Sequence, residues 1–187
     1  MTEKELIQGC KKQDRRCQNA LYKLYFPLLS SIALRYSDNE EEAIQHINYG
    51  FLKVLQNIES YNPEYALATW IRNILINHII DENRKKRLYV SNIEVVEDIE
   101  SEDLHDYNDG EQRMQADDLL ALLRQLPDSS RKVFTLFAID GFKHKEIAEM
   151  LDISEGTSKW HVNDARKKLM DLLHKEKKTI NESRLTS

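Results

Sequence analysis

The segment LPDSSRKVFTLFAIDGFKHKEIAEMLDISEGTSKWHVNDARKKL runs from Leu126 to Leu169 and holds three helical patterns separated by two breaks. The first pattern, capped by Asp128 or Ser129, ends at Gly141, where a helix C′ glycine belongs. A short helix over 145–151, a turn over 152–154 and a helix over 155–174 follow. A short helix, a turn of this length and a second helix are typical of a helix-turn-helix.

The helix predicted over 155–174 has an apolar face and a donor-rich face. The apolar face and the residues expected to pack on it are Ile147, Ala148, Leu151, Ile153, Val162, Ala165 and Leu169. The opposite face carries side chains suited to base edges and phosphates in a major groove, namely Thr157, Lys159, Trp160, His161, Asn163 and Arg166. An ordinary helical hairpin has the same spacing, so the pattern alone leaves both interpretations open.

The composition favours long helices throughout the chain. Among 187 residues there are 5 Gly and 3 Pro, well below average usage, which argues against β-sandwiches and glycine-rich loops. No apolar run reaches the ~20 residues of a membrane span, and the charged first ten residues lack the apolar core of a secretory signal. We expect a soluble cytoplasmic protein, with Cys10 and Cys17 as small side chains on one helical face.

The charge is divided unevenly along the chain. The net charge is −5, yet residues 88–118 alone hold eleven acidic residues and one basic residue. The rest of the chain keeps 26 basic and 21 acidic residues. An acidic segment of this kind is typical of a flexible linker. We therefore expect a helical domain over 1–88, an acidic linker over 89–115, a second helical domain over 116–176 and a disordered tail over 177–187.

The N-terminal half contains four further helical patterns. Thr2 to Glu5 matches a capping box, and a second amphipathic pattern follows around 21–32. A helix over 41–58, preceded by a cap at Asp38 and Asn39, should bury Ile44, Ile47, Phe51, Leu52 and Leu55. The segment 59–67 is predicted to be a loop.

The last pattern, over 69–87, predicts a long helix with two faces. One face is a core stripe of Trp70, Ile71, Ile74, Leu75, His78 and Ile79. The other holds Asn73, Asn77, Arg84 and Lys85. The basic run at 84–87 fits either a solvated helix end or a contact with phosphate.

The two halves together resemble one protein family. Residues 126–169 look like the minus-35-reading domain of bacterial sigma factors, while NYGFLKVLQNI (48–58) and TWIRNILINHIIDENRKKR (69–87) resemble the sigma domain that binds polymerase and the minus-10 element. With no third globular domain between them, the chain resembles an extracytoplasmic-function (ECF) sigma factor. The resemblance implies an all-α fold of two small helical domains, a region-two bundle and a region-four helix-turn-helix domain.

The family resemblance also assigns residues to DNA. By this resemblance, the minus-35 duplex would be contacted by Arg131, Lys143, Thr157, Ser158, Lys159, Trp160, His161, Asn163 and Arg166. The melted minus-10 strand would be contacted by Tyr61, Trp70, Asn73, Asn77, Arg84 and Lys85, with the loop at 61–67 capturing a flipped base. His161 and Asp164 stand where the family often has Arg, and Asp164 is left out because it would repel phosphate.

Core RNA polymerase is the main protein partner that the resemblance implies. The largest-subunit clamp coiled coil would be contacted by Gln45, Asn48, Phe51, Leu52, Lys53 and Leu55, and the polymerase flap is a second expected contact. Gln45 and Asn48 depart from the acidic residue and Gln that are frequent in the family. Relatives are often held by an anti-sigma factor, which adds a further candidate partner.

The sequence carries no catalytic constellation. It has no Walker loop, its six His residues are dispersed, and no metal or cofactor is expected. The leading interpretation is a non-enzymatic sigma factor that directs promoter-specific initiation. A helix-turn-helix regulator that is not a polymerase subunit remains an alternative, although no dimerisation heptad is present. A helical adaptor without a DNA role is a third.

Overall fold

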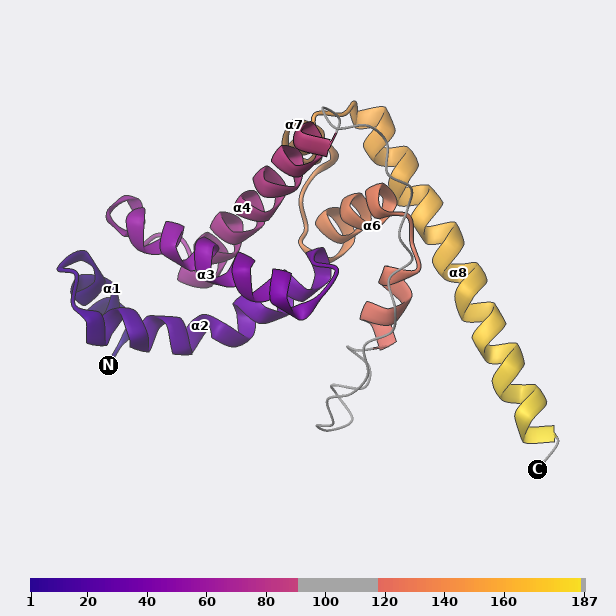
Figure 1. Cartoon of the computed structure of the whole chain (residues 1–187), viewed down its shortest axis with the longest axis horizontal. Helices are drawn as coiled ribbons and strands as arrows, with labels where there is room; N and C mark the ends of the chain where they lie inside the picture. The colour runs from indigo at the N-terminus through magenta and orange to yellow at the C-terminus, as the bar shows by residue number, and fades with distance from the viewer. Residues whose placement is uncertain (91–117, 186–187) are drawn as a thin grey trace. The chain divides into compact units, whose positions relative to one another are not determined.

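A computed structural model describes residues 1–90 and 118–185, and these form helices and turns without a strand (Figure 1). This confirms the all-α fold class. The chain divides into two compact units, Met1–Ser101 and Glu102–Ser187, called here the first and second unit. Most of the acidic linker expected over 89–115 lies outside the described residues. Within those ranges no helix is long and apolar enough to cross a bilayer.

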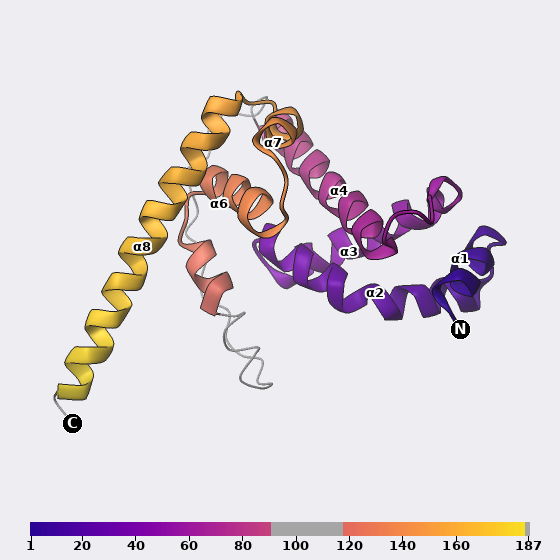
Figure 2. The ribbon, with the colours of Figure 1, turned by 180° about the vertical axis from the view of Figure 1, so that it is seen from behind.

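The first unit packs four α-helices around one core. They are α1 (Glu3–Lys11), α2 (Arg15–Tyr36), α3 (Glu40–Gln56) and α4 (Leu67–Val90), with a 3-10 turn η1 at Ile58–Ser60. Helices α2, α3 and α4 pack against one another, and α1 lies on α2 (Figures 1 and 2). Their amphipathic faces meet in a core whose largest fully buried members are Leu21, Leu29, Ile32, Ile47, Val54, Ile71, Leu75, Ile76 and Ile79.

The predicted caps of the first unit are present. The Thr2 amide donates to Glu5 Oε2 at 2.7 Å, and the Glu5 amide donates to Thr2 Oγ1 at 3.3 Å. The side chain of Asn39 caps α3 by accepting from the Glu42 amide at 2.8 Å. These local bonds satisfy amides that lack a partner in the first turn of a helix.

The two cysteines do not share a helical face as expected. Cys10 is in α1 and Cys17 is in α2, and both are buried free thiols. Gln13, in the left-handed region at φ 58°, reverses the chain between the two helices. The turn brings Gly9 so close to Cys17 that a Cβ at Gly9 would lie 2.1 Å from the sulfur. The two cysteines, seven residues apart in the chain, therefore lie on two different helices that pack together.

The second unit begins with a helical turn over 118–124 and continues with α6 (Asp128–Phe134), a π-helical turn η2 (Thr135–Ile139), α7 (His144–Leu151) and α8 (Glu155–Leu185). Leu123, Leu126 and Ala165 form a buried cluster, with Phe134 and Leu169 packed on it. Helices α6 and α7 both pack on α8. The packing of α7 on α8 across a tight turn confirms the helix-turn-helix geometry.

Three local features position α7 and α8. Gly141 has φ 77°, which only a residue without Cβ adopts easily. Asp152 ends α7 in the left-handed conformation at φ 56° and ψ 50°, and Ser154 Oγ caps α8 by accepting from the Thr157 amide at 2.9 Å. At its other end α8 continues to Leu185. The expectation of a disordered tail over 177–187 is therefore wrong for residues 177–185, which are helical. The Lys, Glu and Leu residues of α8 are good helix formers.

Candidate nucleic-acid interface

The outer face of α8 presents a row of exposed side chains. The predicted minus-35 residues that are exposed on α8 are Thr157, Lys159, Trp160, Asn163 and Arg166, and Lys143, which directly precedes α7, is exposed as well. Trp160 is 60% exposed, and the Arg166 guanidinium lies 5.9 Å from the centre of the Phe137 ring, a cation–π distance. This row combines ammonium, guanidinium, amide and hydroxyl donors on one side of the helix that follows the turn.

Ser158 is on the inner face of α8 and does not reach the surface. Its side chain is fully buried, and its Oγ lies 2.9 Å from His144 Nδ1. The His144 ring stacks on Phe137 with centroids 4.3 Å apart. Ser158 thus anchors α8 to α7, which corrects the expectation that it contacts DNA.

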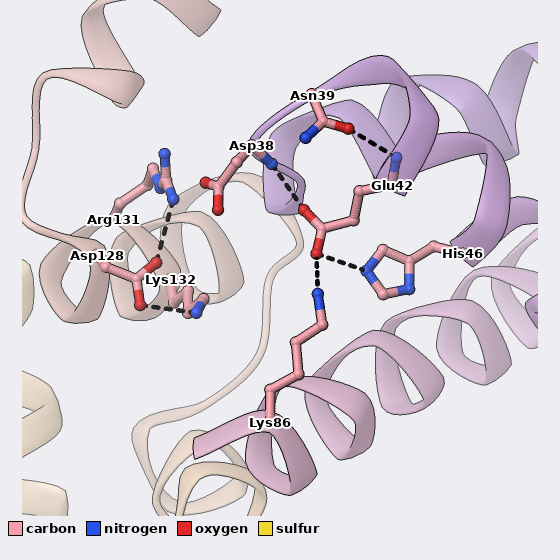
Figure 3. A network of polar contacts seen from close by, with 8 residues as sticks. All are labelled: Asp38, Asn39, Glu42, His46, Lys86, Asp128, Arg131 and Lys132. Atoms are coloured by element: carbon pink, nitrogen blue, oxygen red, sulfur yellow. Dashed lines mark hydrogen bonds and ion pairs between the residues drawn. The ribbon is translucent and has the colours of Figure 1, made fainter. Parts of the chain in front are cut away.

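Arg131 is largely covered and already paired. Its side chain is 12% exposed and Nη2 lies 3.1 Å from Asp128 Oδ1, while Lys132 Nζ lies 2.7 Å from Oδ2 (Figure 3). Burial raises the pKa of Asp128, but the Lys132 hydrogen bond and the charges of both cations outweigh it, so the pKa is below its ordinary value. The carboxylate therefore holds Arg131 against α6, and a phosphate contact would have to compete with it.

His161 and Asp164 meet a buried serine from α6. Ser130 is 2% exposed, and its Oγ lies 3.0 Å from His161 Nδ1 and 2.9 Å from Asp164 Oδ2. Lys168 Nζ lies 3.0 Å from the same carboxylate oxygen. The hydrogen bonds from Lys168 and Ser130 lower the pKa of Asp164. Asp164 is therefore an ionised partner within the unit, although sequence reasoning treated it only as a repulsive charge.

The loop between α3 and α4 exposes a different tyrosine from the predicted one. Tyr61 is 8% exposed, its hydroxyl donates to the Tyr65 carbonyl at 2.7 Å, and its ring centre lies 5.2 Å from that of Trp70. Tyr61 therefore braces the loop, which corrects its assignment as a contact of the minus-10 strand. Tyr65, absent from the predicted minus-10 set, is 67% exposed. Its position in an aromatic-rich loop was the available signal.

The polar residues of α4 differ in accessibility. Asn77 is exposed, whereas Asn73 and Trp70 are half-buried, and Asn73 Oδ1 is buried without a hydrogen bond to a described residue. Arg84 and Lys85 are exposed and lie 3.6 Å and 2.8 Å from acidic side chains one turn earlier, Asp81 and Glu82. Exposed pairs of this kind are weak and leave the cations available to phosphate.

The outer face of α3 carries exposed apolar side chains. Ile44 is 52% exposed and Leu52 48% exposed, so the expectation that both lie in the core is wrong. Phe51 is 6% exposed and packs edge-on against Tyr22 at 5.0 Å, which corrects its assignment as a polymerase contact. We define the α3 surface as Ile44, Gln45, Asn48, Tyr49 and Leu52, all exposed; Lys53 and Leu55 are half-buried beside it.

A charged network closes the start of α3 against α4. Glu42 accepts from the Asp38 amide at 2.9 Å, lies 3.9 Å from His46 Nε2 and pairs with Lys86 (Figure 3). Burial raises the pKa of Glu42, but these hydrogen bonds outweigh it and hold the pKa below its usual value. The network ties α3 to α4. Within the described parts of the chain, no three His, Cys, Asp or Glu side chains are grouped to hold a metal.

Family comparisons account for both units. The family model described as Sigma-70 region 2 matches residues 21–89, and that described as Sigma-70, region 4 matches residues 116–169. An ECF RNA polymerase sigma factor, EcfG of Rhodopseudomonas palustris, is 28% identical over 148 residues, covering 79% of this chain and 80% of the relative. The chain belongs to the ECF sigma factors.

Further relatives span nearly the whole of this sigma factor. The ECF RNA polymerase sigma-E factor of Haemophilus influenzae is 24% identical over 177 residues, covering 89% of this chain and 92% of the relative. The solved sigma factor RpoE of Bartonella quintana, in complex with the anti-sigma factor NepR, is similar with TM-score 0.59 and 26% identity, covering 83% of this chain and 96% of that one. CnrH, solved in complex with the cytosolic domain of CnrY, shares the fold with TM-score 0.50 and 20% identity, covering 90% and 95%.

As an ECF sigma factor, the chain directs promoter-specific transcription by RNA polymerase, which favours this function over that of a separate helix-turn-helix regulator. The α3 surface, the 61–67 loop and the exposed part of α4 lie within the region 2 match. The exposed row of α8 lies within the region 4 match.

Proposed function

We propose that the α3 surface binds the clamp coiled coil of core polymerase. Exposed Ile44, Tyr49 and Leu52 alternate with the amides of Gln45 and Asn48 on one side of α3. Buried apolar contacts with a polar rim are the usual composition of such an interface. The flap of the polymerase is a proposed contact of the second unit.

The exposed row of α8 is proposed to read the minus-35 duplex, and this row is the observation that carries the proposal. Lys159 and Arg166 would anchor phosphates, while Asn163 and Trp160 lie between them on the exposed side. Because Ser158 is bonded to His144 on the inner side, the rotation of α8 about its axis is set before DNA arrives.

The minus-10 strand is proposed to pass along the 61–67 loop and α4. Exposed Tyr65 offers a ring for stacking on an unpaired base, worth about 1–3 kcal/mol. Exposed Asn77 offers donors and an acceptor to a base edge, and Arg84 and Lys85 offer charge to the backbone. In this proposal the chain acts in the cytoplasm, has no catalytic activity and needs no cofactor, since synthesis belongs to the polymerase.

An anti-sigma factor is a further proposed partner. Support comes from the similar Bartonella quintana sigma factor, which was solved in complex with the anti-sigma factor NepR. The exposed apolar residues of the α3 surface would be accessible to such a regulator in the free chain.

Reconstitution with core polymerase tests the proposal. We expect promoter-specific run-off transcripts from the purified chain and core enzyme. Leu52→Glu should abolish holoenzyme formation, whereas Leu24→Glu, a matched change on α2 at a site 54% exposed, should not. A chain that binds duplex DNA but never forms a holoenzyme would instead support the separate regulator.

A second arm separates the two DNA contacts. Asn77→Ala should leave duplex binding unchanged and slow strand opening, followed by permanganate reactivity of unpaired thymines. Lys159→Ala should instead weaken duplex binding and leave the rate of strand opening in the bound complex unchanged. Normal opening by the Asn77 variant would refute the role given to α4.

A further inference from the structure

Ser130, His161 and Asp164 form a chain of two hydrogen bonds in the second unit, and the direction of each bond can be assigned. Ser130 Oγ is within hydrogen-bond distance of both His161 Nδ1, at 3.0 Å, and Asp164 Oδ2, at 2.9 Å. A serine hydroxyl has one hydrogen to donate, and an ionised carboxylate can only accept. Asp164 is held ionised by Lys168, 3.0 Å away, so the hydroxyl hydrogen is committed to the carboxylate.

The commitment of that hydrogen decides which His161 nitrogen is protonated. Ser130 Oγ can only accept from His161, so Nδ1 carries the hydrogen of the neutral ring. Burial lowers the pKa of His161 despite the neighbouring Asp164 charge, which favours the neutral ring at pH 7. The opposite nitrogen, Nε2, then has a free lone pair. His161 is partly exposed, and its Nε2 is not one of the buried, unbonded polar atoms among the described residues. Nε2 is therefore accessible to a donor from outside the unit.

The position of His161 brings this lone pair to the DNA-facing part of α8. The residue lies one turn after exposed Thr157 and directly after exposed Trp160, whose ring centre is 4.9 Å away. Residues in the first turns of a recognition helix are those that approach base edges. In the major groove an acceptor can pair with the amino group of adenine N6 or cytosine N4, and it finds no partner on guanine O6 and N7.

We propose that His161 is a specificity-determining residue that reads an amino group, on adenine or cytosine, through its Nε2 lone pair, and that Ser130 and Asp164 are positioning residues that set this tautomer. The inference rests on the proposed reading of the minus-35 duplex by α8. It differs from a generic cationic contact, because an arginine at this position would donate and prefer guanine.

Nitrogen NMR of the full-length chain tests the tautomer without DNA. Long-range ¹H–¹⁵N spectra of ¹⁵N-histidine-labelled protein should show His161, assigned with His161→Gln, as the Nδ1–H form. Ser130→Ala should shift it toward the Nε2–H form. Ser31→Ala is the matched control, since it removes an exposed serine hydroxyl from α2 of the first unit and should leave the His161 signals unchanged. An Nε2–H ring in the unmodified chain, or no response to Ser130→Ala, would overturn the inference.

Selection from a randomised duplex library tests the reading. The full-length chain should enrich adenine or cytosine at one position of the contacted strand by roughly tenfold over the other bases. Ser130→Ala should lose this preference at that position alone, and His161→Arg should replace it with guanine. Enrichment elsewhere in the site without a Ser130-dependent preference overturns this inference alone. No enrichment of any duplex by the unmodified chain overturns it together with the proposed minus-35 contact.

Discussion

Two histidines lie buried against each other in the first unit. His78 of α4 is 4% exposed and His46 of α3 is 5% exposed, with ring centres 5.7 Å apart. Neither nitrogen of His78 has a hydrogen bond to a described residue. Burial, reinforced by the charge of Lys53, lowers the pKa of His78 to about 4. The folded unit therefore holds this ring neutral.

The first unit should lose stability in mild acid. A histidine in the unfolded chain is protonated below about pH 6.5, whereas His78 in the folded unit has a pKa of about 4. The stability that neutral His78 contributes is therefore complete above about pH 6.5 and is lost as the pH falls toward 4. The full loss from this residue is about 3 kcal/mol. Urea unfolding measures this loss, followed by the fluorescence of Trp70 in a chain whose other tryptophan, Trp160 of the second unit, is replaced by Phe. His78→Leu should make the loss smaller without removing it, because burial lowers the pKa of His46 as well. A flat profile in the unmodified chain would refute the assignment.

Lys159 and Arg166 should each contribute one phosphate contact. Replacing either with Ala should weaken duplex binding and lower the slope of log affinity against log salt by about 0.9. Lys23→Ala removes the same charge from an exposed site on α2 and should change neither quantity. Salt titrations of duplex affinity provide the measurement. An unchanged slope in both α8 variants would remove them from the interface.

The residue scale also shows where sequence reasoning reached its limit. Lys159, Asn163 and Asn77 are exposed where the helical pattern predicted them. Ser158 and Tyr61 carry equally suitable groups but are buried. Residue type predicts which chemistry is possible, and the packing of neighbouring elements decides which groups are accessible.

At the scale of elements, the contact between α1 and α2 depends on a missing side chain. A Cβ at Gly9 would lie 2.6 Å from Cys17 Cβ, an atom that side-chain rotation cannot remove. Gly9→Ala should therefore destabilise the first unit by about 1–3 kcal/mol, measured by urea unfolding.

A second glycine provides the control for that change. At Gly156, in the first turn of α8, the nearest atom to a new Cβ is Ser154 Oγ at 3.5 Å, an ordinary contact. Gly156→Ala should leave the first unit unchanged and stabilise the second by up to about 1 kcal/mol. Equal stability of the Gly9 variant and the unmodified chain would show that α1 shifts without cost.

At the scale of the whole molecule, charge separates the DNA-binding flanks from the segment between them. The whole chain has a net charge of −5, whereas the chain without residues 88–118, with 26 basic and 21 acidic residues, has a net charge of +5. We expect that neutralising the eleven acidic residues strengthens duplex binding by the free chain, because a competing anionic field is removed.

Duplex affinity at several salt concentrations measures this effect. A chain with the same segment in scrambled order keeps the charge and should bind as the unmodified chain does. If neutralisation changes neither the affinity nor the salt slope, the acidic segment does not compete with DNA.

The helices, their caps and the helix-turn-helix spacing follow from the amino-acid order alone. Thr2, Asn39 and Ser154 cap helices through bonds to amides within three residues, and apolar periodicity is equally local, so both can be read without a structure. The family resemblance rests on the same local patterns.

Tertiary structure decided which side of each helix is covered. Leu52 and Ile47 both fit an apolar pattern of α3, the helix on which α2 and α4 pack, yet Ile47 is buried and Leu52 is exposed. Likewise, only the packing of α6 on α8 brings Ser130 between His161 and Asp164, which are 31 and 34 residues away in the chain. Burial and hydrogen-bond order depend on groups distant in sequence, which a local pattern does not contain.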